Sequence, residues 1–433
     1  MKIKSSFCLG LTLTMILLVG AHVSAQSSEP KLEVGTQVTS FTLSGLLYGY
    51  NYNASELGFG GRITYNFNRS VAVEAESNFF PHRSIFGGLG EGRALQAQFG
   101  LKAGKRFKKF GVFGKVRPGF LSIGEVFSNE PGSSAVFQGN TFTNVRIGRQ
   151  THFTTDVGGV LELYPSPRSI VRFDAGDTIV RYGPHFDYTP PTYELVRLPA
   201  YIKHNFQFSA GVGFRLGHAA SSQPAPSPRA GQSRVKAPRF EAGVQFTSLS
   251  VNPPDFPCPD ICLSGGPPRS FPEPGLGGRF TFNLSDSIGL EAETNFFGHD
   301  EVGWAGHMFQ AQFGIKAGKR FRKFGVFAKA RPGFVGSTKV NQLVATHTTT
   351  IFNQQVTYGE FRVGTKKYFS TDIGGVLEFY VSHRVLTRMD VGDTIIHYSE
   401  RDGAGFALNR LIVRVPPETR HNLQFSAGLG FRF

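Results

Sequence analysis

The chain contains the same sequence pattern twice, and this internal repeat constrains its fold more than any other feature. Three blocks return nearly unchanged further along the chain, namely 96–107 as 310–321, 155–162 as 371–378, and 208–215 as 425–432. Among these three blocks the offset changes only from 214 to 217 residues, so insertions fall between the blocks, where loops are expected. A period of roughly 200 residues is a whole domain and far exceeds a solenoid repeat.

The first residues have the parts of a secretory signal peptide. Lys2 and Lys4 give it a positive start, residues 9–20 are apolar, and Ala25 offers a small residue before a cleavage point. Such a segment is removed on export. We therefore expect residues 1–25 to be cleaved off close to Gln26.

Within each copy, apolar and polar residues alternate with the period of a β-strand. In the first copy this pattern predicts eight strands, near 31–42, 57–67, 71–79, 94–105, 110–121, 152–164, 168–181 and 203–216. In the last of them every second residue from Phe206 to Leu216 is apolar, and the run that ends at Phe433 repeats the pattern. About ten tilted residues are enough for a strand to cross a bilayer. The sequence thus predicts an all-β fold with strands long enough to span a membrane.

The polar faces of these strands carry charges of both signs. A lumen charge network is predicted from nine of them: Glu74, Glu76, Lys102, Lys115, Arg117, Asp156, Glu162, Arg172 and Asp174. In a narrow transmembrane barrel these side chains would pair inside, and the apolar faces would meet lipid. A soluble sandwich would turn its strands the other way. Alternation alone fits both arrangements.

The lengths of the connections favour the membrane barrel. Short links are expected at 68–70, 106–109 and 165–167, and long ones near 43–56, 80–93, 122–151 and 182–202. Outer-membrane barrels have short periplasmic turns and longer outside loops in this alternating order. A soluble antiparallel barrel has no physical reason to sort its loops by length.

The C-terminal strand adds separate support. Aromatic and apolar residues alternate up to Phe431 and Phe433, a pattern that resembles the signal read by the barrel assembly machinery. Each whole repeat resembles the OmpA/OmpX-type small outer-membrane barrels, a superfamily of eight-stranded domains. The resemblance implies a membrane-embedded barrel with a largely filled lumen. This chain departs from the usual form in having two copies and no recognisable peptidoglycan-binding domain.

Sixteen strands fit either two small barrels or one large one. An aqueous lumen appears at about sixteen strands, as in porins. Two tandem eight-stranded barrels are favoured, because each copy has its own closing strand and the Pro/Ser/Ala-rich linker is longer than the other turns at its end. The predicted organisation is signal peptide 1–25, first barrel 31–216, linker 217–238 and second barrel 239–433.

Candidate catalytic residues do not share a face. His204 and Ser209 lie five residues apart, and Asp174 and Asp177 three apart, as do their repeats in the second copy. On a strand, odd spacings point side chains to opposite faces, which argues against a nucleophile–base pair or a carboxylate pair. We therefore expect a non-enzymatic protein with no catalytic residues, no cofactor and no metal site.

Charge and cysteine content bear on partners. The formal net charge is +15, and loss of Lys2 and Lys4 leaves 15 − 2 = +13. In an exported protein this favours outer-membrane lipid and lipopolysaccharide over nucleic acid as partners. Cys258 and Cys262 could form a loop disulfide in an oxidising compartment. Free thiols remain an alternative, and a metal site would need further ligands.

These features together predict a bacterial outer-membrane protein of the cell envelope, with a structural or surface-interaction role. Binding functions concentrate in loops held on a rigid scaffold, so the long connections are the candidate contact regions. The extracellular ligand is not identifiable from the sequence. A porin or small-solute channel is the main alternative, and a lipid-modifying barrel enzyme is a weaker one.

Overall fold

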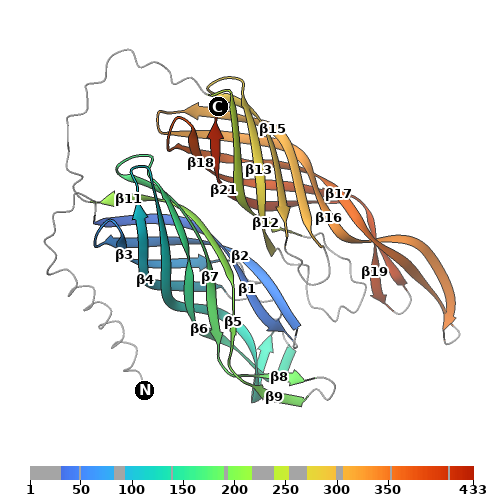
Figure 1. Cartoon of the computed structure of the whole chain (residues 1–433). Helices are drawn as coiled ribbons and strands as arrows, with labels where there is room; N and C mark the ends of the chain where they lie inside the picture. Colours follow the sequence, from blue (N-terminus) through green and yellow to red (C-terminus); the bar gives the residue numbers. More distant parts are fainter. Residues whose placement is uncertain are drawn as a thin grey trace, which may run out of the picture.

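The fold is seen in a computed structural model (Figure 1). The structure describes residues 31–47, 50–81, 93–137, 140–189, 194–216, 238–252, 271–298, 306–351, 354–407 and 410–433. The predicted signal peptide, the linker apart from Pro238, and both Cys258 and Cys262 lie outside the described residues. No helix of membrane-crossing length and hydropathy occurs among the described residues, a finding that concerns helices alone.

The first repeat closes into an antiparallel barrel. Its eight wall strands are β1 (Leu32–Leu47), β2 (Tyr50–Asn66), β3 (Val71–Phe80), β4 (Ala94–Arg106), β5 (Phe110–Phe137), β6 (Asn140–Leu163), β7 (Ser169–Tyr182) and β11 (Phe206–Leu216). Each strand pairs with the next, and β11 pairs with both β7 and β1, which closes the wall. A closed barrel leaves no strand edge in the wall unpaired.

The second repeat closes in the same way. Its wall strands are β12 (Phe240–Val251), β13 (Phe271–Asn283), β14 (Ile288–Phe297), β15 (Met308–Arg320), β16 (Phe324–Ile351), β17 (Gln354–Tyr380), β18 (Val385–Tyr398) and β21 (Glu418–Arg432). The strand β21 pairs with β18 and with β12. The predicted pair of eight-stranded barrels is thus confirmed, and the alternative of one sixteen-stranded barrel is wrong.

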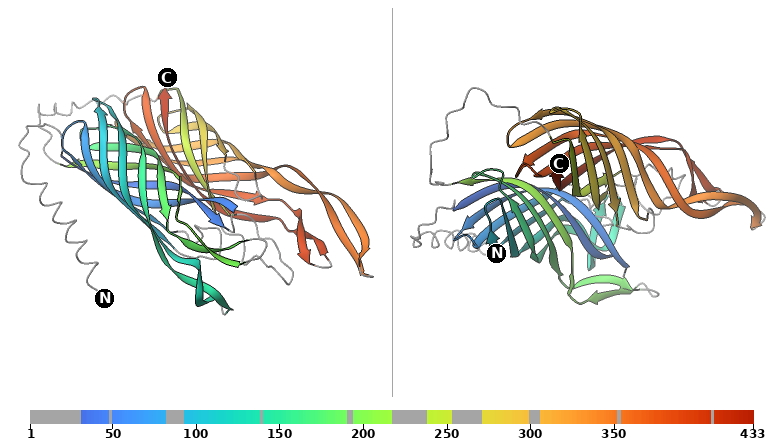
Figure 2. Two further views of the ribbon diagram at one scale, coloured as in Figure 1. Left: turned by 60° about the horizontal axis from the view of Figure 1, so that its bottom comes forward. Right: turned by 45° about the horizontal axis from the view of Figure 1, so that its top comes forward.

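The two ends of each barrel differ. At one end, here called the short-turn end, consecutive strands are joined by the turns 67–70, 107–109 and 164–168, and by 284–287, 321–323 and 381–384 in the second barrel. At the opposite end, the long-hairpin end, β5 with β6 and β16 with β17 continue far past the wall. Both barrels lie side by side with these ends in the same sense (Figures 1 and 2).

Three segments predicted to be loops contain β-strands in the structure. The segment 43–56 continues β1 and β2 up to a pair between Leu47 and Tyr50, and 122–151 continues β5 and β6 up to Phe137 and Asn140. The segment 182–202 contains three short strands, β8 (His185–Thr189), β9 (Glu194–Leu198) and β10 (Tyr201–Lys203). Beyond the barrel both faces of a hairpin meet solvent, so its sequence need not alternate and the periodicity gives no signal.

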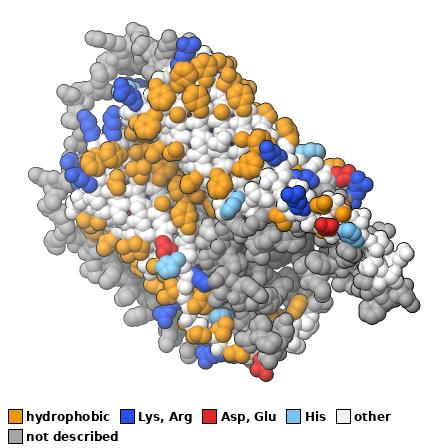
Figure 3. All heavy atoms as spheres, turned by 45° about the vertical axis from the view of Figure 1, so that its right-hand side comes forward, with side chains coloured by type: hydrophobic (Ala, Val, Ile, Leu, Met, Phe, Trp, Pro, Cys, Tyr) orange, Lys and Arg blue, Asp and Glu red, His pale blue; other side chains and the backbone are white. Residues whose placement is uncertain are grey.

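Alternation along each strand separates the two faces of the wall. In the first barrel the charges of the predicted lumen network are buried inside, whereas apolar side chains such as Ile63, Phe99 and Phe214 are more than half exposed on the outside. Figure 3 shows hydrophobic side chains gathered over the barrel walls. This is the reverse of a soluble fold, in which apolar residues fill the core.

In the second barrel two further strands, β19 (Arg401–Ala407) and β20 (Arg410–Val415), form a separate hairpin at the long-hairpin end (Figure 1). This hairpin and the short strands of the first barrel extend the structure on the same side as the long hairpins. The material beyond the walls therefore lies mainly at one end.

Candidate functional site

The interior of each barrel is filled by buried polar side chains. The nine residues predicted to form the network of the first barrel are all inside it, and each is at most 4% exposed: Glu74, Glu76, Lys102, Lys115, Arg117, Asp156, Glu162, Arg172 and Asp174. They come from β3, β4, β5, β6 and β7, where alternate positions face inward. The strands thus aim charges of both signs at one narrow space.

Arg117 is one centre of this network. Its guanidinium binds Glu76 on β3, and its Nη2 lies 2.6 Å from Oδ2 of Asp156 on β6. The same Asp156 oxygen lies 2.8 Å from Nζ of Lys115. Arg117 therefore bridges Glu76 and Asp156, and Asp156 also pairs with Lys115. These buried side chains fill the space between the strands.

Arg172 and Glu74 form the second centre. The Arg172 guanidinium donates to Asp174 at 2.7 Å and to Glu74 Oε2 at 2.8 Å. Lys102 Nζ lies 3.3 Å from Glu74 Oε1 and 2.5 Å from Glu162 Oε1. Glu74 on β3 and Arg172 on β7 are not neighbours in the wall, so this contact crosses the lumen.

The network includes further charges that the sequence did not single out. Arg62 Nη1 lies 3.8 Å from Asp174 Oδ2, and Glu33 Oε1 lies 3.1 Å from Arg106 Nη2 and 3.3 Å from Arg215 Nε. These residues occupy the alternate positions of their strands that face the lumen. A count of alternate positions along every strand would therefore have found them.

The second barrel repeats the network residue by residue. Its members are Glu291, Glu293, Lys316, Lys329, Arg331, Asp372, Glu378, Arg388 and Asp390. Arg331 Nη2 lies 2.5 Å from Asp372 Oδ2, Lys329 Nζ lies 2.8 Å from the same oxygen, and Lys316 Nζ lies 2.5 Å from Glu378 Oε1. Two sequences that have diverged elsewhere keep the same contacts, which indicates that the network is a property of the fold.

A layer of amide side chains lies next to the charges, toward the long-hairpin end. Gln37 Nε2 donates to Asn78 Oδ1, Asn78 Nδ2 to Gln96 Oε1, and Gln96 Nε2 to Gln207 Oε1, each at 2.9 Å. The oxygen of Gln207 also accepts from Thr178 at 2.9 Å. The second barrel has an equivalent chain of amides. These bonds span the lumen from one side of the wall to the other.

An apolar plug closes the lumen at the long-hairpin end. In the first barrel it consists of Phe41, Leu43, Phe80, Ala94, Leu121, Ile123 and Val180. In the second barrel it consists of Leu249, Val251, Phe297, Met308, Val335, Tyr368, Ile396 and Tyr398. The polar inward face of the strands does not continue into this end of the lumen. Bulky apolar side chains pack against one another here and are almost completely buried.

The suspected catalytic groups are kept apart by the wall. His204 Nδ1 lies 2.6 Å from Asp177 Oδ2 on the exposed outer face, whereas Ser209 is buried inside, 2.8 Å from Thr39 Oγ1. Asp174 lies in the lumen, on the opposite face from Asp177. The second barrel has the same separation. Neither a His–Ser pair nor an Asp pair is formed at these positions.

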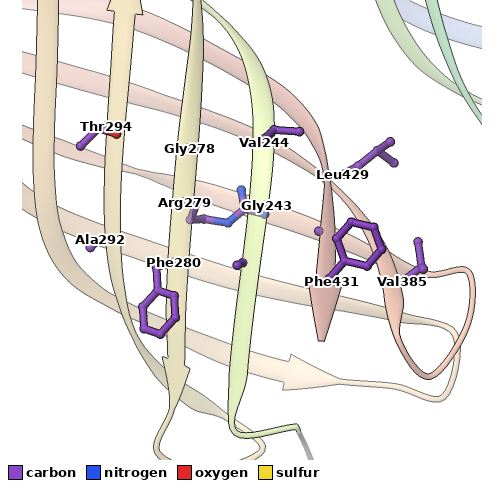
Figure 4. A pocket seen from close by; sticks show the side chains of 12 residues that line it. Gly243, Val244, Gly278, Arg279, Phe280, Ala292, Thr294, Val385, Leu429 and Phe431 are labelled. Atoms are coloured by element: carbon purple, nitrogen blue, oxygen red, sulfur yellow. The ribbon is translucent and has the colours of Figure 1, made fainter. Parts of the chain in front are cut away.

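A shallow apolar depression of about 600 Å³ lies on the outer wall of the second barrel, over β12, β13 and β21 (Figure 4). Gly278 and Ala292 leave space between Val244, Phe280 and Phe431. Its lining contains no Ser, Cys, His, Asp or Glu among the described residues. Over the same described part of the chain, no cluster of three metal-ligating side chains was found. Thr294 and Arg279 are the only polar side chains that the described residues contribute to this lining, and the depression mainly offers apolar packing surface.

The predicted assembly signal lies at the closing edge of the second barrel. Phe431 is 60% and Phe433 is 66% exposed on the outer wall. The backbone of Phe433 exchanges two hydrogen bonds with Phe240 on β12, at 2.9 and 3.1 Å. The C-terminal aromatic residues are thus positioned on the seam at which the barrel closes.

Comparison with known proteins gives only structural likenesses. No family model matches the chain. No curated protein matches its sequence. Among solved structures it is similar to Neisserial surface protein A, with 11% identity, 43% of this chain and 97% of that chain covered, and a TM-score of 0.29. It is also similar to the N-terminal β-barrel domain of Pseudomonas aeruginosa OprF, with 12% identity, 42% and 96% covered, and a TM-score of 0.23.

A third likeness extends over most of the chain. It is to a Pseudomonas aeruginosa FadL homologue, with 11% identity, 93% of this chain and 90% of that chain covered, and a TM-score of 0.25. Identities and TM-scores this low carry no argument about function, so the function is inferred from the side chains of this chain alone.

Proposed function

We propose that this chain is a non-enzymatic bacterial outer-membrane protein, in which two closed barrels carry long hairpins on the cell surface. One observation carries this proposal: each barrel has an apolar outer wall around a lumen filled by paired charges, amides and an apolar plug. The wall fits lipid, and the filled lumen fits a structural or surface-contact role.

The outer wall supports a membrane location. Large apolar side chains on both barrels, among them Ile63, Phe99 and Phe313, are more than half exposed. Apolar surface left in water costs about 25 cal/mol per Å², so an apolar belt this wide would be strongly unfavourable on a soluble protein. In a bilayer the same belt is solvated by acyl chains, and a closed barrel leaves no backbone group of its wall unpaired.

The two unlike ends support the orientation. Short turns face the periplasm and longer connections face outward in outer-membrane barrels. The chain enters at Leu32 and leaves at Leu216 on the short-turn end, and the second barrel has the same arrangement. We therefore place the linker in the periplasm and the hairpins β5–β6 and β16–β17 outside the cell.

The filled lumen argues against a porin. Eight strands enclose a space that side chains can fill, whereas porins need about sixteen. In each barrel, charges, amides and the apolar plug follow one another along the lumen. Purified full-length protein in a planar bilayer is therefore expected to show no steady conductance. Steady, large conductance steps would overturn the structural role and favour a channel.

Localisation is tested by protease treatment of intact cells. Cleavage is expected within 124–149 and 338–365, which lie in the long hairpins, while the turns at 107–109 and 321–323 stay intact until the envelope is opened. Cleavage at the turns first would reverse the proposed orientation. Soluble protein in the periplasm would refute the membrane location.

The proposed partners follow from the apolar outer wall of the barrels and from the charged residues beyond it. The apolar belt contacts outer-membrane lipid, and exposed cations beyond it, such as Arg149 and Arg181, suit the phosphates of lipopolysaccharide. The aromatic C-terminal strand suits recognition by the barrel assembly machinery. A lipid-modifying activity is not favoured, because the suspected groups lie on opposite sides of the wall. Changed lipid masses in cells that express the protein would revive that alternative.

A further inference from the structure

A stripe on the outer wall of each barrel is buried although it faces away from the lumen. Val171, Ala210 and Phe425 are at most 5% exposed, whereas Phe99 and Phe313, which also face outward, are 56% and 59% exposed. Packing within a single barrel wall does not explain this difference, because all five side chains point away from the interior. Something outside the wall covers the stripe.

The cover of each stripe is the other barrel. The rings of Phe208 and Phe246 stack with their centroids 4.1 Å apart and at an angle of 28°. One apolar cluster includes side chains of both barrels: Val38, Leu57, Leu161, Leu163, Val171, Phe173, Phe208, Ala210 and Val212 from the first, and Phe379, Val381, Met389, Phe425, Ala427 and Leu429 from the second. The barrels therefore meet through side chains that would otherwise face lipid.

The stripe of the first barrel and the stripe of the second barrel consist largely of repeat-equivalent positions. Five positions of the cluster are occupied by repeat-equivalent residues on both sides: Leu163 with Phe379, Phe173 with Met389, Phe208 with Phe425, Ala210 with Ala427, and Val212 with Leu429. The repeat equivalents of Phe208 and Phe246 are Phe425 and Val38, and both of these belong to the cluster. Such reciprocal use of one surface is the property of a two-fold interface.

The path of the stripe gives the direction of the two-fold axis. Since barrel strands tilt, a line parallel to the barrel axis crosses several of them. From the short-turn end to the long-hairpin end the cluster crosses β6, β7, β11, β1 and β2. The strands β2 and β13, which are repeat equivalents, also approach each other. Both barrels point the same way (Figures 1 and 2), so the axis runs along the barrels.

We infer that the two barrels are a fixed pair in the membrane, related by a pseudo-two-fold axis along the membrane normal, and that this stripe is a barrel-pairing surface whose partner is a second copy of the same barrel. The duplicated chain is thus a covalent form of a homodimer. Between membrane proteins, close packing rather than the hydrophobic effect drives association, and small residues permit close approach. Ala210 and Ala427 supply such small residues at the middle of the stripe. This inference rests on the proposed membrane location.

The first test asks whether the barrels stay together when the linker is cut. A protease site is inserted within 217–238 of the full-length protein, which is refolded in mild detergent, cut and analysed by size-exclusion chromatography. The two halves are expected to elute together. Ala210→Trp with Ala427→Trp is expected to separate them, since two indoles cannot fit into the stripe. Ala103→Trp with Ala317→Trp, at exposed outward positions, is the matched control and is expected to leave the pair intact.

Heat-modifiable migration of each half on gels reports folding separately from pairing. Halves that separate in the unsubstituted protein while each still migrates as a folded barrel would overturn the pairing and leave the membrane proposal standing. The pairing would also be overturned if the Ala210/Ala427 and Ala103/Ala317 double tryptophan variants eluted alike after the linker is cut. Halves that never show the folded form in detergent or lipid would instead count against the proposed function.

The second test locates the contact in a bilayer. Phe208→Cys with Phe246→Cys, in a protein that also carries Cys258→Ser and Cys262→Ser, is treated with a short bis-maleimide after insertion into vesicles. Most of the protein is expected to run as a linked pair of halves after the linker is cut. Phe99→Cys with Phe313→Cys is the control and is expected to stay unlinked. Equal linkage in both, or none in the first, would overturn the proposed contact.

Discussion

At the scale of single residues, the lumen charges are held by mutual neutralisation. Arg117 is fully buried between Glu76 and Asp156, and Arg331 repeats this position in the second barrel. A buried ion pair gains little net stability over an apolar packing, because both ions lose their hydration. Removal of one partner is costly, because the other charge is left without water and without a counter-ion.

We predict that Arg117→Met lowers the free energy of unfolding by about 3–5 kcal/mol, because Glu76 and Asp156 then lose their shared cation. Urea titration, followed by the fraction of heat-modifiable protein on gels, measures this change. Arg146→Met is the control, since its pair with Glu130 at 3.5 Å is exposed. An exposed pair contributes about 1 kcal/mol or less. Equal losses in the two variants would contradict the role given to burial.

Crowding inside the wall predicts a second residue effect. A Cβ atom at Gly60 would lie 2.0 Å from Asn78 Oδ1, whereas a Cβ atom at Gly159, which faces outward, meets nothing within 4 Å. Gly60→Val should therefore destabilise the first barrel by about 1–3 kcal/mol, the usual cost of overpacking. Gly159→Val should fold like the unsubstituted protein. A Cβ atom at Gly60 would also lie 2.5 Å from the backbone oxygen of Ser77. The same urea titration checks both variants, and indistinguishable midpoints would contradict the crowding at Gly60.

At the scale of elements, the long strands have two parts. Up to Ile123, β5 pairs with β6 in one continuous register, and beyond it the register shifts between Ile123 and Val126 and again between Asn129 and Ser134. The non-glycine residues Glu125 and Asn144 have φ values of 51° and 58° in this region. The change in regularity marks where the wall ends and the free hairpin begins.

We predict that replacing 127–147 by a short turn leaves the first barrel intact, because the lumen network, the apolar plug and Val126, which packs against the plug, lie outside this segment. The shortened protein should keep its heat-modifiable migration and its urea midpoint. Deletion of Val116 alone is the contrasting change. It shifts the strand by one residue and turns charges toward lipid, so loss of folding is expected. Loss of folding in the shortened protein would show that the hairpin is part of the barrel.

At the scale of the whole molecule, each repeat contains every element of a closed barrel. In the first repeat the closing pairs of β11 with β1 and with β7 lie between residues 32 and 216. All three layers of the lumen also come from this repeat alone. The apolar contacts between the repeats lie on the outer wall.

We therefore predict that a fragment ending at Leu216 folds without the second repeat. Its gel migration should be heat-modifiable, as for the full chain, because closure needs no strand of the second barrel. The free stripe should also make this fragment dimerise in mild detergent. Folding of the full chain alone, with the fragment remaining aggregated, would contradict the independence of the two barrels.

Much of the fold follows from the sequence by itself. The repeat determined the number of domains, and alternation determined which residues share a face, so Glu74 and Arg172 are predicted to point inward without knowledge of any contact. Both are local properties, carried by neighbouring residues in the chain. The ends of the long hairpins are not predictable in this way, because paired backbones surrounded by solvent need no alternation.

Only the tertiary structure decided which side chains meet. Strand tilt and register place Glu74 against Arg172 across the lumen, bring Phe41 and Leu121 together as a plug, and set Phe208 against Phe246 between the barrels. These partners are 98, 80 and 38 residues apart in sequence. Alternation says only that a side chain faces in or out. Its height and its angle around the barrel depend on closure, and these decide whether an inward charge finds a counter-ion or an outward phenylalanine finds lipid or a sister barrel.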